Sequence, residues 1–321
     1  MSESDRRDMI RFLIGRLLLT LPVMAVVSVV VFSLLYLTPG DPAEVIAGDI
    51  ASPAEVEALR EHLGLDRPFL ERFGTWVTHV LSGDLGVSIF SQIPVTTLIA
   101  QRLAATLWLT CATVVLSTAI AIPAGIAAAS WKNSGLDRTI MTFSTLGFSV
   151  PVFVVGYLLI YFFSIKLKWF PVQGFVPPGT SFTGFLRSIA LPALSLSLVY
   201  VALIARMTRA SMIEIMSGDF VRTARAKGLS PARIVWVHAL RNASLPIVTT
   251  IGMGIAALLG GVVVTESVFG IPGLGRLLVD SVLSRDYPLI QALILLFAFA
   301  YVVINLVTDL VYMLIDPRLR T

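Results

Sequence analysis

Charged side chains are scarce in this chain of 321 residues. Asp, Glu, Lys and Arg together make up 14% of it, whereas hydrophobic residues make up 56%. A soluble domain carries roughly 25% charged residues. The mean hydropathy of +0.86 agrees with this imbalance. The composition therefore excludes an ordinary water-soluble globular protein and indicates a protein embedded in a membrane.

Cysteine and histidine are also rare. Cys111 is the only cysteine, so no disulfide can form within the chain and its fold does not depend on an oxidising compartment. The three histidines, His62, His79 and His238, are scattered, and no group of Cys and His has the spacing of metal ligands. We predict that this chain holds no metal and no cofactor.

The motifs of catalysis are missing as well. The chain has no G-x-x-x-x-G-K-[ST] loop, so it cannot hold nucleotide phosphates in the P-loop manner. No Ser/His/Asp set or carboxylate pair can be placed at one membrane depth. We therefore predict that the chain is not an enzyme. If ATP drives its activity, ATP and magnesium must bind to partner subunits.

Long uncharged runs account for most of the sequence. Each is long enough to cross a bilayer as a helix, and the runs lie at 17–37, 103–131, 139–165, 188–205, 242–265 and 287–308. They predict an all-α integral membrane protein with six transmembrane helices. A polar, acidic segment between the first two runs carries helix-start signals at Ser52 and Pro68. It is either a solvated cap on the bundle or a landing surface for a substrate-binding protein.

The distribution of Lys and Arg gives an orientation. With both termini in the cytoplasm, 15 of the 24 basic residues fall on cytoplasmic segments and the remaining 9 outside, as the positive-inside rule requires. We expect the following segments: cytoplasmic N-terminus 1–11, first span 12–37, external lobe 38–98, second span 99–130, third span 139–165, external loop 166–187, fourth span 188–207, cytoplasmic loop 208–241, fifth span 242–266, external loop 267–286, sixth span 287–315 and cytoplasmic C-terminus 316–321.

The stretch 219–246 stands out between two of these spans. It reads DFVRTARAKGLSPARIVWVHALRNASLP and carries five basic residues. Asp219 is the expected N-cap of a short helix, and Gly228 is its expected stop. Ser230 is then expected to cap a second short helix with Pro231 in its first turn. Read locally, the stretch is either a knob that presses into a partner protein or a basic loop that merely fixes the topology.

This stretch resembles the EAA loop of ABC-importer permeases, in the form of the dipeptide, oligopeptide and nickel branch. Arg222-Thr223-Ala224 stands where the general motif has Glu-Ala-Ala, a departure that also resembles this branch. Further resemblances to the same family extend along nearly the whole chain: FLIGRLLLTLPV, LTPGDPA, LGLDRP, LSGDLGVS, GFSVPVF, HALRNASLP, ESVFGIPGLGRL and DPRLR.

The resemblance implies a coupling helix that docks on an ATPase subunit. The residues that it assigns to coupling are Asp219, Arg222, Thr223, Ala224, Arg225, Ala226, Lys227, Gly228, Leu229, Leu245 and Pro246. It also implies a heterodimer with a second, related permease, two ATPase subunits or domains, and an extracytoplasmic binding protein. The location would be the inner membrane of a bacterium or archaeon. No contact with nucleic acid is implied.

Peptides are the favoured cargo, and relatives of the same architecture carry nickel chelates, glutathione, sugars or opines. Two other classes remain open from the residues alone. An ion-coupled secondary transporter needs buried ionisable residues near the midplane, and the runs from 103 to 165 have none. A membrane enzyme needs clustered His, Asp or Glu at one membrane face, and the sequence shows no such cluster.

Three residues of the fifth span are candidates for the translocation pathway or its gate. Gly260 and Gly261 permit bending or close helix approach. Glu266 is an acid at the end of an apolar run, which is a functional candidate by default. Glu266 either bonds to backbone groups of the following turn, 269–275, or lines the passage.

Overall fold

The computed structural model describes residues 15, 18–33, 43–44, 52–62 and 66–315. The predicted terminal segments 1–11 and 316–321, and parts of the predicted first span and external lobe, lie outside the described residues. The described part of the chain is helical, and its β structure is limited to one isolated bridge between Val87 and Pro94. The all-α expectation is thereby confirmed.

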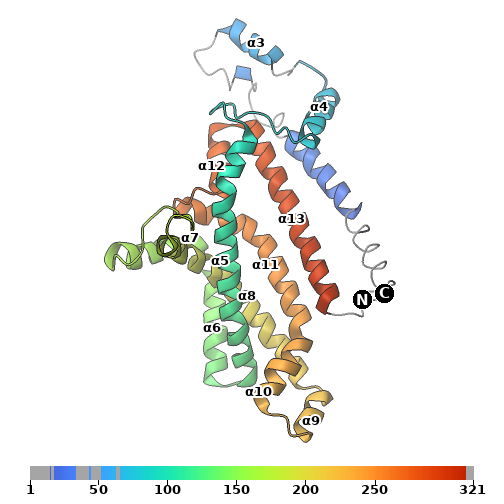
Figure 1. Ribbon diagram of the computed structural model, residues 1–321, viewed down its shortest axis with the longest axis vertical. Helices are drawn as coiled ribbons and strands as arrows, with labels where there is room; N and C mark the ends of the chain where they lie inside the picture. Colours follow the sequence, from blue (N-terminus) through green and yellow to red (C-terminus); the bar gives the residue numbers. More distant parts are fainter. Residues whose placement is uncertain (1–14, 16–17, 34–42, 45–51, 63–65, 316–321) are drawn as a thin grey trace. The chain divides into compact units, whose positions relative to one another are not determined.

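Figure 1 gives the order of the elements. An apolar helix covers Leu18–Ser33. The others are α3 (Pro53–His62), α4 (Phe69–Leu81), α5 (Val95–Ser130), α6 (Gly135–Ser149), α7 (Val152–Leu159), the π-helix η1 (Ile160–Lys166), α8 (Phe182–Met216), α9 (Asp219–Ala226), α10 (Pro231–Arg233), the π-helix η2 (Ile234–Ala239), α11 (Leu240–Val268), α12 (Leu274–Ser284) and α13 (Tyr287–Ile315).

Four described helices are long and apolar enough to cross a bilayer. They are Val95–Ser130, Phe182–Met216, Pro231–Val268 and Tyr287–Met313. The bent pair Gly135–Ser149 and Val152–Lys166 makes a fifth if it is counted as one span. The chain is therefore a multi-pass membrane protein with four or five candidate spans. The predicted first span corresponds to the shorter helix Leu18–Ser33 and to residues outside the described ranges.

The predicted third span, 139–165, is not one straight helix. The chain bends by 101° between α6 and α7. Pro151 has no N–H to continue the helix, and its ring disfavours helical geometry in the residue before it. Val150 accordingly takes extended angles, φ −95° and ψ 124°, while its own N–H still donates to Leu146 O at 3.3 Å. In Figure 1, α7 leaves the bundle sideways.

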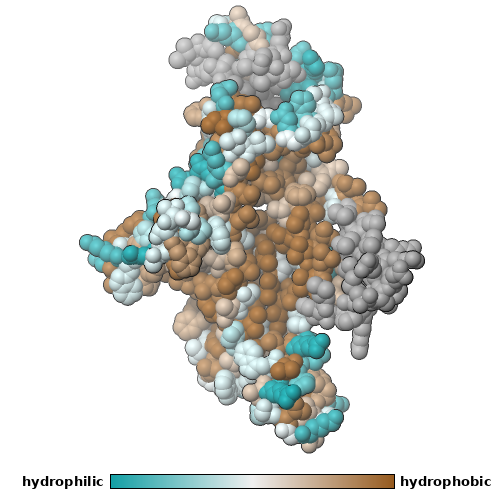
Figure 2. Space-filling model, in the orientation of Figure 1, coloured by the Kyte–Doolittle hydropathy of each residue, from teal (hydrophilic) through white to brown (hydrophobic). Residues whose placement is uncertain are grey.

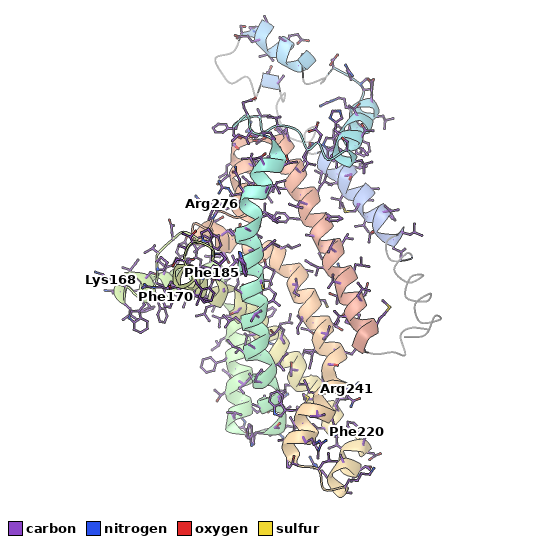
Figure 3. The ribbon with its side chains drawn as sticks, in the orientation of Figure 1. Lys168, Phe170, Phe185, Phe220, Arg241 and Arg276 are labelled. Atoms are coloured by element: carbon purple, nitrogen blue, oxygen red, sulfur yellow. The ribbon has the colours of Figure 1, made fainter. Side chains whose placement is uncertain are left out.

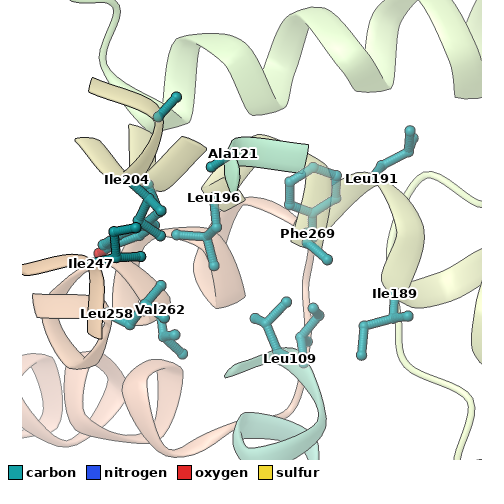
Figure 4. Packing of buried hydrophobic residues seen from close by; sticks show 14 of the residues in the cluster. Leu109, Ala121, Ile189, Leu191, Leu196, Ile204, Ile247, Leu258, Val262 and Phe269 are labelled. Carbon is teal, nitrogen blue, oxygen red and sulfur yellow. The ribbon is translucent and has the colours of Figure 1, made fainter. Parts of the chain in front are cut away.

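The described chain divides into two compact units. The first contains Leu103–Arg276 and the part of α13 from Val303 onward. In it, α5, α6, α8 and α11 run beside one another, and buried apolar side chains of α5, α8 and α11 form one core (Figure 4). Helix α8 lies at the centre of this packing, and buried residues follow it from Phe185 to Met212. Hydrophobic side chains also cover the face of this bundle that Figure 2 shows, as a lipid-facing surface requires.

The second unit contains Arg11–Arg102 and Leu277–Val302. Its aromatic cluster surrounds Phe32, whose ring lies 5.3 Å from Phe69, 5.5 Å from Phe73 and 5.3 Å from Trp76. These three rings come from α4, so the amphipathic helix packs on the apolar helix Leu18–Ser33. This unit thus has a small aromatic core of its own.

Two carboxylates, Asp286 and Glu55, accept hydrogen bonds from nearby loop residues in the second unit. The buried carboxylate of Asp286 accepts a hydrogen bond from Ser88 Oγ and another from Ile89 N at 3.2 Å. At α3, Ser52 donates to Glu55 from its backbone N–H at 2.7 Å and from its hydroxyl at 2.8 Å. These bonds lower the pKa of Glu55 below its ordinary value, because they stabilise the ionised carboxylate.

Candidate functional site

Helix α9 lies at the end of the first unit's bundle, between the end of α8 and the start of α10 (Figure 1). Its N-cap is Gly218, with extended angles φ −72° and ψ 150°, and no side chain caps it. The expectation that Asp219 is the N-cap is therefore wrong. Asp219 is the first helical residue, where its negative charge still favours the positive end of the helix dipole. Its exposed carboxylate lies 3.5 Å from the guanidinium of Arg222.

Gly228 ends α9, as the sequence predicts. Its φ of +77° lies in the left-handed region, which a side chain disfavours. Its N–H donates to Arg225 O at 2.9 Å, and the N–H of Leu229 donates to Ala224 O at 3.2 Å. This pair of bonds is the Schellman arrangement, which satisfies the last carbonyls of a helix. The chain therefore turns sharply here without losing backbone hydrogen bonds.

The second short helix is not a separate element. Ser230 does cap it, accepting from Arg233 N at 3.4 Å, with Pro231 at its start. However, α10 continues through η2 into α11, and the whole helix runs from Pro231 to Val268 over 38 residues. The stretch 219–246 is thus one short helix, a glycine turn, and the beginning of the long helix Pro231–Val268. A π-helical segment such as η2 is rare and is often found at functional sites.

One face of α9 is buried and the other is open. Val221 on α9 and Ile234 on η2 are both 1% exposed, and α9 packs against η2. The open face is basic and continues onto the following helix: Arg222, Arg225, Lys227, Arg233 and Arg241 are all exposed. Asp219 is the single acid between 219 and 246. Phe220 lies at the same end of the unit as Arg241 (Figure 3), and 42% of it is exposed.

The remaining residues assigned to coupling divide by position. Thr223 and Ala226 are exposed on α9, and Ala224 and Leu229 are half-buried. Leu245 and Pro246 lie inside α11, where their carbonyls accept hydrogen bonds from the hydroxyls of Thr249 and Thr250. The structure thus brings Asp219–Leu229 together at one corner and places Leu245 and Pro246 in the adjoining helix.

The pathway candidates lie in the other half of α11. A Cβ built on Gly260 meets nothing within 4 Å, whereas one on Gly261 lies 3.2 Å from Leu196 of α8. Gly261 therefore permits a close contact between two helices, and Gly260 faces open space.

Glu266 is completely buried in the structure. Its carboxylate accepts from the hydroxyl of Thr106 on α5 at 2.6 Å and from the backbone N–H of Arg276 in α12 at 3.0 Å. Thr106 in turn accepts from Leu274 N at 2.8 Å. A Cβ on Gly273 would lie 2.0 Å from the carboxylate, so a side chain there would displace Glu266 from these contacts. These contacts fix the turn that joins α11 to α12.

One buried ionic contact was not predicted from the sequence. Asp137, which the sequence places in the connection before the third span, is 3% exposed on α6, and it binds Arg209 of α8 through two hydrogen bonds of 2.6 and 2.7 Å. The helix start around Asp137, though not its partner Arg209, could be recognised from the local sequence. Ser134-Gly-Leu-Asp137 has the pattern of a helix N-terminus, and Ser134 Oγ accepts from Asp137 N at 3.2 Å.

Comparison with known protein families gives this arrangement its context. The family described as "Binding-protein-dependent transport system inner membrane component" matches residues 121–321. The corresponding N-terminal family, "Binding-prot-dependent transport system membrane comp, N-term", matches residues 9–110. The chain belongs to this transport family. It is thus the inner membrane component of an ABC transport system that depends on a binding protein, and it is not the catalytic subunit.

Relatives of this inner membrane component are similar over their whole length. A probable peptide ABC transporter permease protein of Sinorhizobium fredii is 48% identical over 310 residues, which cover 96% of this chain and 99% of the relative. The glutathione transport system permease protein GsiC of Escherichia coli strain K12 is 45% identical over 312 residues, or 97% and 99% of the two chains.

A solved structure has the same fold as part of this permease. An inward-facing conformation of the MetNI methionine ABC transporter superposes with a TM-score of 0.59 at 18% identity, covering 69% of this chain and 97% of that chain. At this identity the likeness concerns the fold alone.

Thr106 tests the polar contacts around Glu266. Thr106→Val keeps the shape of the side chain but removes the hydrogen bonds to Glu266 and from Leu274 N. We expect it to destabilise the permease by about 1–3 kcal/mol, because buried polar groups lose their partners. Thermal unfolding of the purified assembly in detergent measures the change. Thr106→Ser, which keeps the hydroxyl, is the control. Equal melting temperatures for the two variants would contradict this account of the turn.

Proposed function

We propose that this permease forms, with a second related permease, the translocation pathway of an ATP-driven importer, and that α9 is its coupling helix. Substrate delivered by the binding protein enters a cavity between the two permeases. Two ATPase subunits or domains bind below it and supply the energy. ATP binding closes them and draws the coupling helices together, which turns the pathway outward, and hydrolysis resets it.

The observation that carries this proposal is the way α9 joins the membrane helices. Its open face is polar and basic, so it suits a protein partner in water. Its buried face packs on η2, the first part of the helix Pro231–Val268. On its other side only Ser217 and Gly218 separate it from α8. A force on α9 is therefore applied directly to two long helices of the bundle.

The proposed orientation places α9 in the cytoplasm together with both termini. It rests on the excess of Lys and Arg on that side. The lobe formed by α3 and α4 then faces the outside, where a binding protein arrives. That lobe is helical and acidic, and its surface is available as the landing surface for such a protein.

Short peptides are the proposed cargo. The Sinorhizobium relative is named for peptides, and the Escherichia relative for glutathione, which is itself a small peptide. Glutathione is therefore the alternative within the same chemical class. Nickel chelates, sugars and opines have no such support among these relatives.

Gly228 tests the coupling role of α9. Gly228→Trp places a bulky side chain at a left-handed position and on the proposed docking surface, and the backbone strain alone costs about 1–2 kcal/mol. We expect strongly reduced uptake and more ATP hydrolysed per substrate in the assembled transporter, with normal amounts of permease in the membrane. Gly228→Asn is the control, because Asn tolerates this conformation and a Cβ here meets nothing within 4 Å. Unchanged uptake for Gly228→Trp would count against the coupling role.

A single cysteine tests the orientation. In a chain whose exposed Cys111 is replaced by Ser, we expect Arg225→Cys to react with a membrane-impermeant maleimide only after the cells are opened. Phe90→Cys, at an exposed position in the lobe, should react in intact cells. Labelling of Arg225→Cys in intact cells would place α9 outside and end the proposal.

The partner binding protein tests the cargo. Mass spectrometry of the ligand retained on it after purification should find short peptides or glutathione. A retained sugar, opine or nickel chelate would overturn the peptide assignment while leaving the transport mechanism intact.

A further inference from the structure

The Asp137–Arg209 ion pair joins two helices of the first unit in a fixed geometry. Arg209 Nε donates to one carboxylate oxygen of Asp137 at 2.6 Å, and Arg209 Nη2 donates to the other at 2.7 Å. The exposed fraction of the Asp137 side chain is 4%, and that of Arg209 is 25%. A two-pronged contact of this kind fixes the orientation as well as the distance of its partners.

Asp137 also holds the turn between α5 and α6. Its carboxylate accepts from Asn133 N at 2.9 Å, and its own N–H donates to Ser134 Oγ at 3.2 Å. Asn133 has a φ of +66°, in the left-handed region. The carboxylate therefore links the α5–α6 turn, the first turn of α6 and α8 through one group.

Arg209 lies close to α9 along the chain. Helix α8 ends at Met216, two turns beyond Arg209, and α9 begins at Asp219. Close backbone contacts support this part of α8 on both sides. A Cβ on Gly125 of α5 would lie 2.7 Å from Ala205 O, and one on Gly147 of α6 would lie 3.1 Å from Leu198 O. Helices α5 and α6 therefore approach the backbone of α8 closely at Gly125 and Gly147.

Beyond the Pro151 bend, α7 packs against the end of α11. A Cβ on its Gly156 would lie 3.2 Å from the ring of Phe269 and 3.3 Å from Val268, at the end of α11. The contacts thus run from α9 through α8 to α6, and from α7 to the turn that Glu266 holds.

We propose that the Asp137–Arg209 pair is a positioning contact that transmits movement of the α8–α9 corner to α6 and, across the Pro151 bend, to α7 and the end of α11. A buried charged pair is costly to desolvate, and removing one partner leaves an uncompensated charge, so the pair strongly constrains the two helices that carry it. Helices that are held together only by apolar contacts can slide past one another. The two-pronged ion pair instead fixes the register of α6 against α8. The inference rests on the proposed role of α9 in coupling.

Arg209→Lys tests the pair. Lysine keeps the charge but cannot make the planar, two-pronged contact. The assembled transporter, with its ATPases and binding protein, is reconstituted in vesicles and supplied with a di- or tripeptide. We expect the amount of peptide transported per ATP hydrolysed to fall about fivefold or more, the lower range of coupling between distant sites, while the ATPase rate stays near that of the parent.

Two controls separate coupling from plain stability. Arg206→Lys makes the same change one turn earlier on α8, at an exposed position, and should leave the ratio unchanged. Asp137→Asn should lower the ratio like Arg209→Lys. The double variant should be no worse than the more affected single one, because both remove one interaction.

The possible outcomes separate this inference from the proposed function. A parallel loss of assembled complex, ATPase rate and uptake, with an unchanged ratio, would make the pair a purely structural contact and overturn the inference. Additive effects in the double variant would also overturn it. If Arg209→Lys is inert while Gly228→Trp uncouples, the inference fails and the coupling role of α9 stands. If the ATPase does not bind the permease through α9, the proposed function itself fails.

Discussion

Every polar group that this chain removes from water needs a partner within the chain. In hydrocarbon an unsatisfied amide costs several kcal/mol, so long helices are the available solution, and the side chains follow the same constraint. Thr113 donates to the carbonyl of Leu109 four residues earlier, and Ser195 donates to the carbonyl of Pro192. In the described part of the chain, Thr208 Oγ1 is the single buried side-chain nitrogen or oxygen atom without a hydrogen-bond partner.

The same constraint decides where the bundle departs from straight helices. At Pro151 the missing N–H allows the chain to turn by 101°, and the helices on either side keep their own bonds. At Gly228 the Schellman bonds close α9, whose basic face is exposed. At the end of α11, Glu266 supplies an acceptor to Arg276 N in the first turn of α12. Each departure from a straight helix thus depends on a specific residue. Pro151 removes a helical hydrogen bond, whereas the bonds at Gly228 and Glu266 satisfy backbone groups at the end of one helix and the start of another.

Local signals predicted a large part of this structure. Hydrophobic runs located the long helices, and Gly228, Ser230 and Pro231 located the corner around α9, because these residues act on the backbone next to them. One local prediction was wrong: Gly218, and not Asp219, is the N-cap of α9, because the backbone angles and not the side-chain type decide that position. The run 139–165 gave no sign of direction, because hydropathy measures composition alone, although Ser149-Val150-Pro151 contained the reason for the bend.

Contacts between distant segments were beyond such reasoning. Asp137 and Arg209 are 72 residues apart, and each by itself reads as an ordinary charge near a membrane surface. The same holds for Thr106 and Glu266, which are 160 residues apart. Periodicity shows which face of a helix is apolar, but α5 and α8 are apolar on most of their surface and give no preferred partner. Only the packing of the bundle decides which polar groups meet.

The proposed mechanism places opposite demands on the polar groups of the permease, and this chain separates the two kinds of group in space. The residues offered to a partner must be exposed, so that binding and release are reversible. Arg222, Arg225 and Lys227 meet that demand, since exposed ion pairs contribute little stability and exchange readily. The residues that carry force must resist sliding, and a buried two-pronged pair such as Asp137–Arg209 does so because breaking it leaves an uncompensated charge. In the proposed mechanism, the exposed basic helix α9 and the buried Asp137–Arg209 pair are therefore complementary parts of one lever.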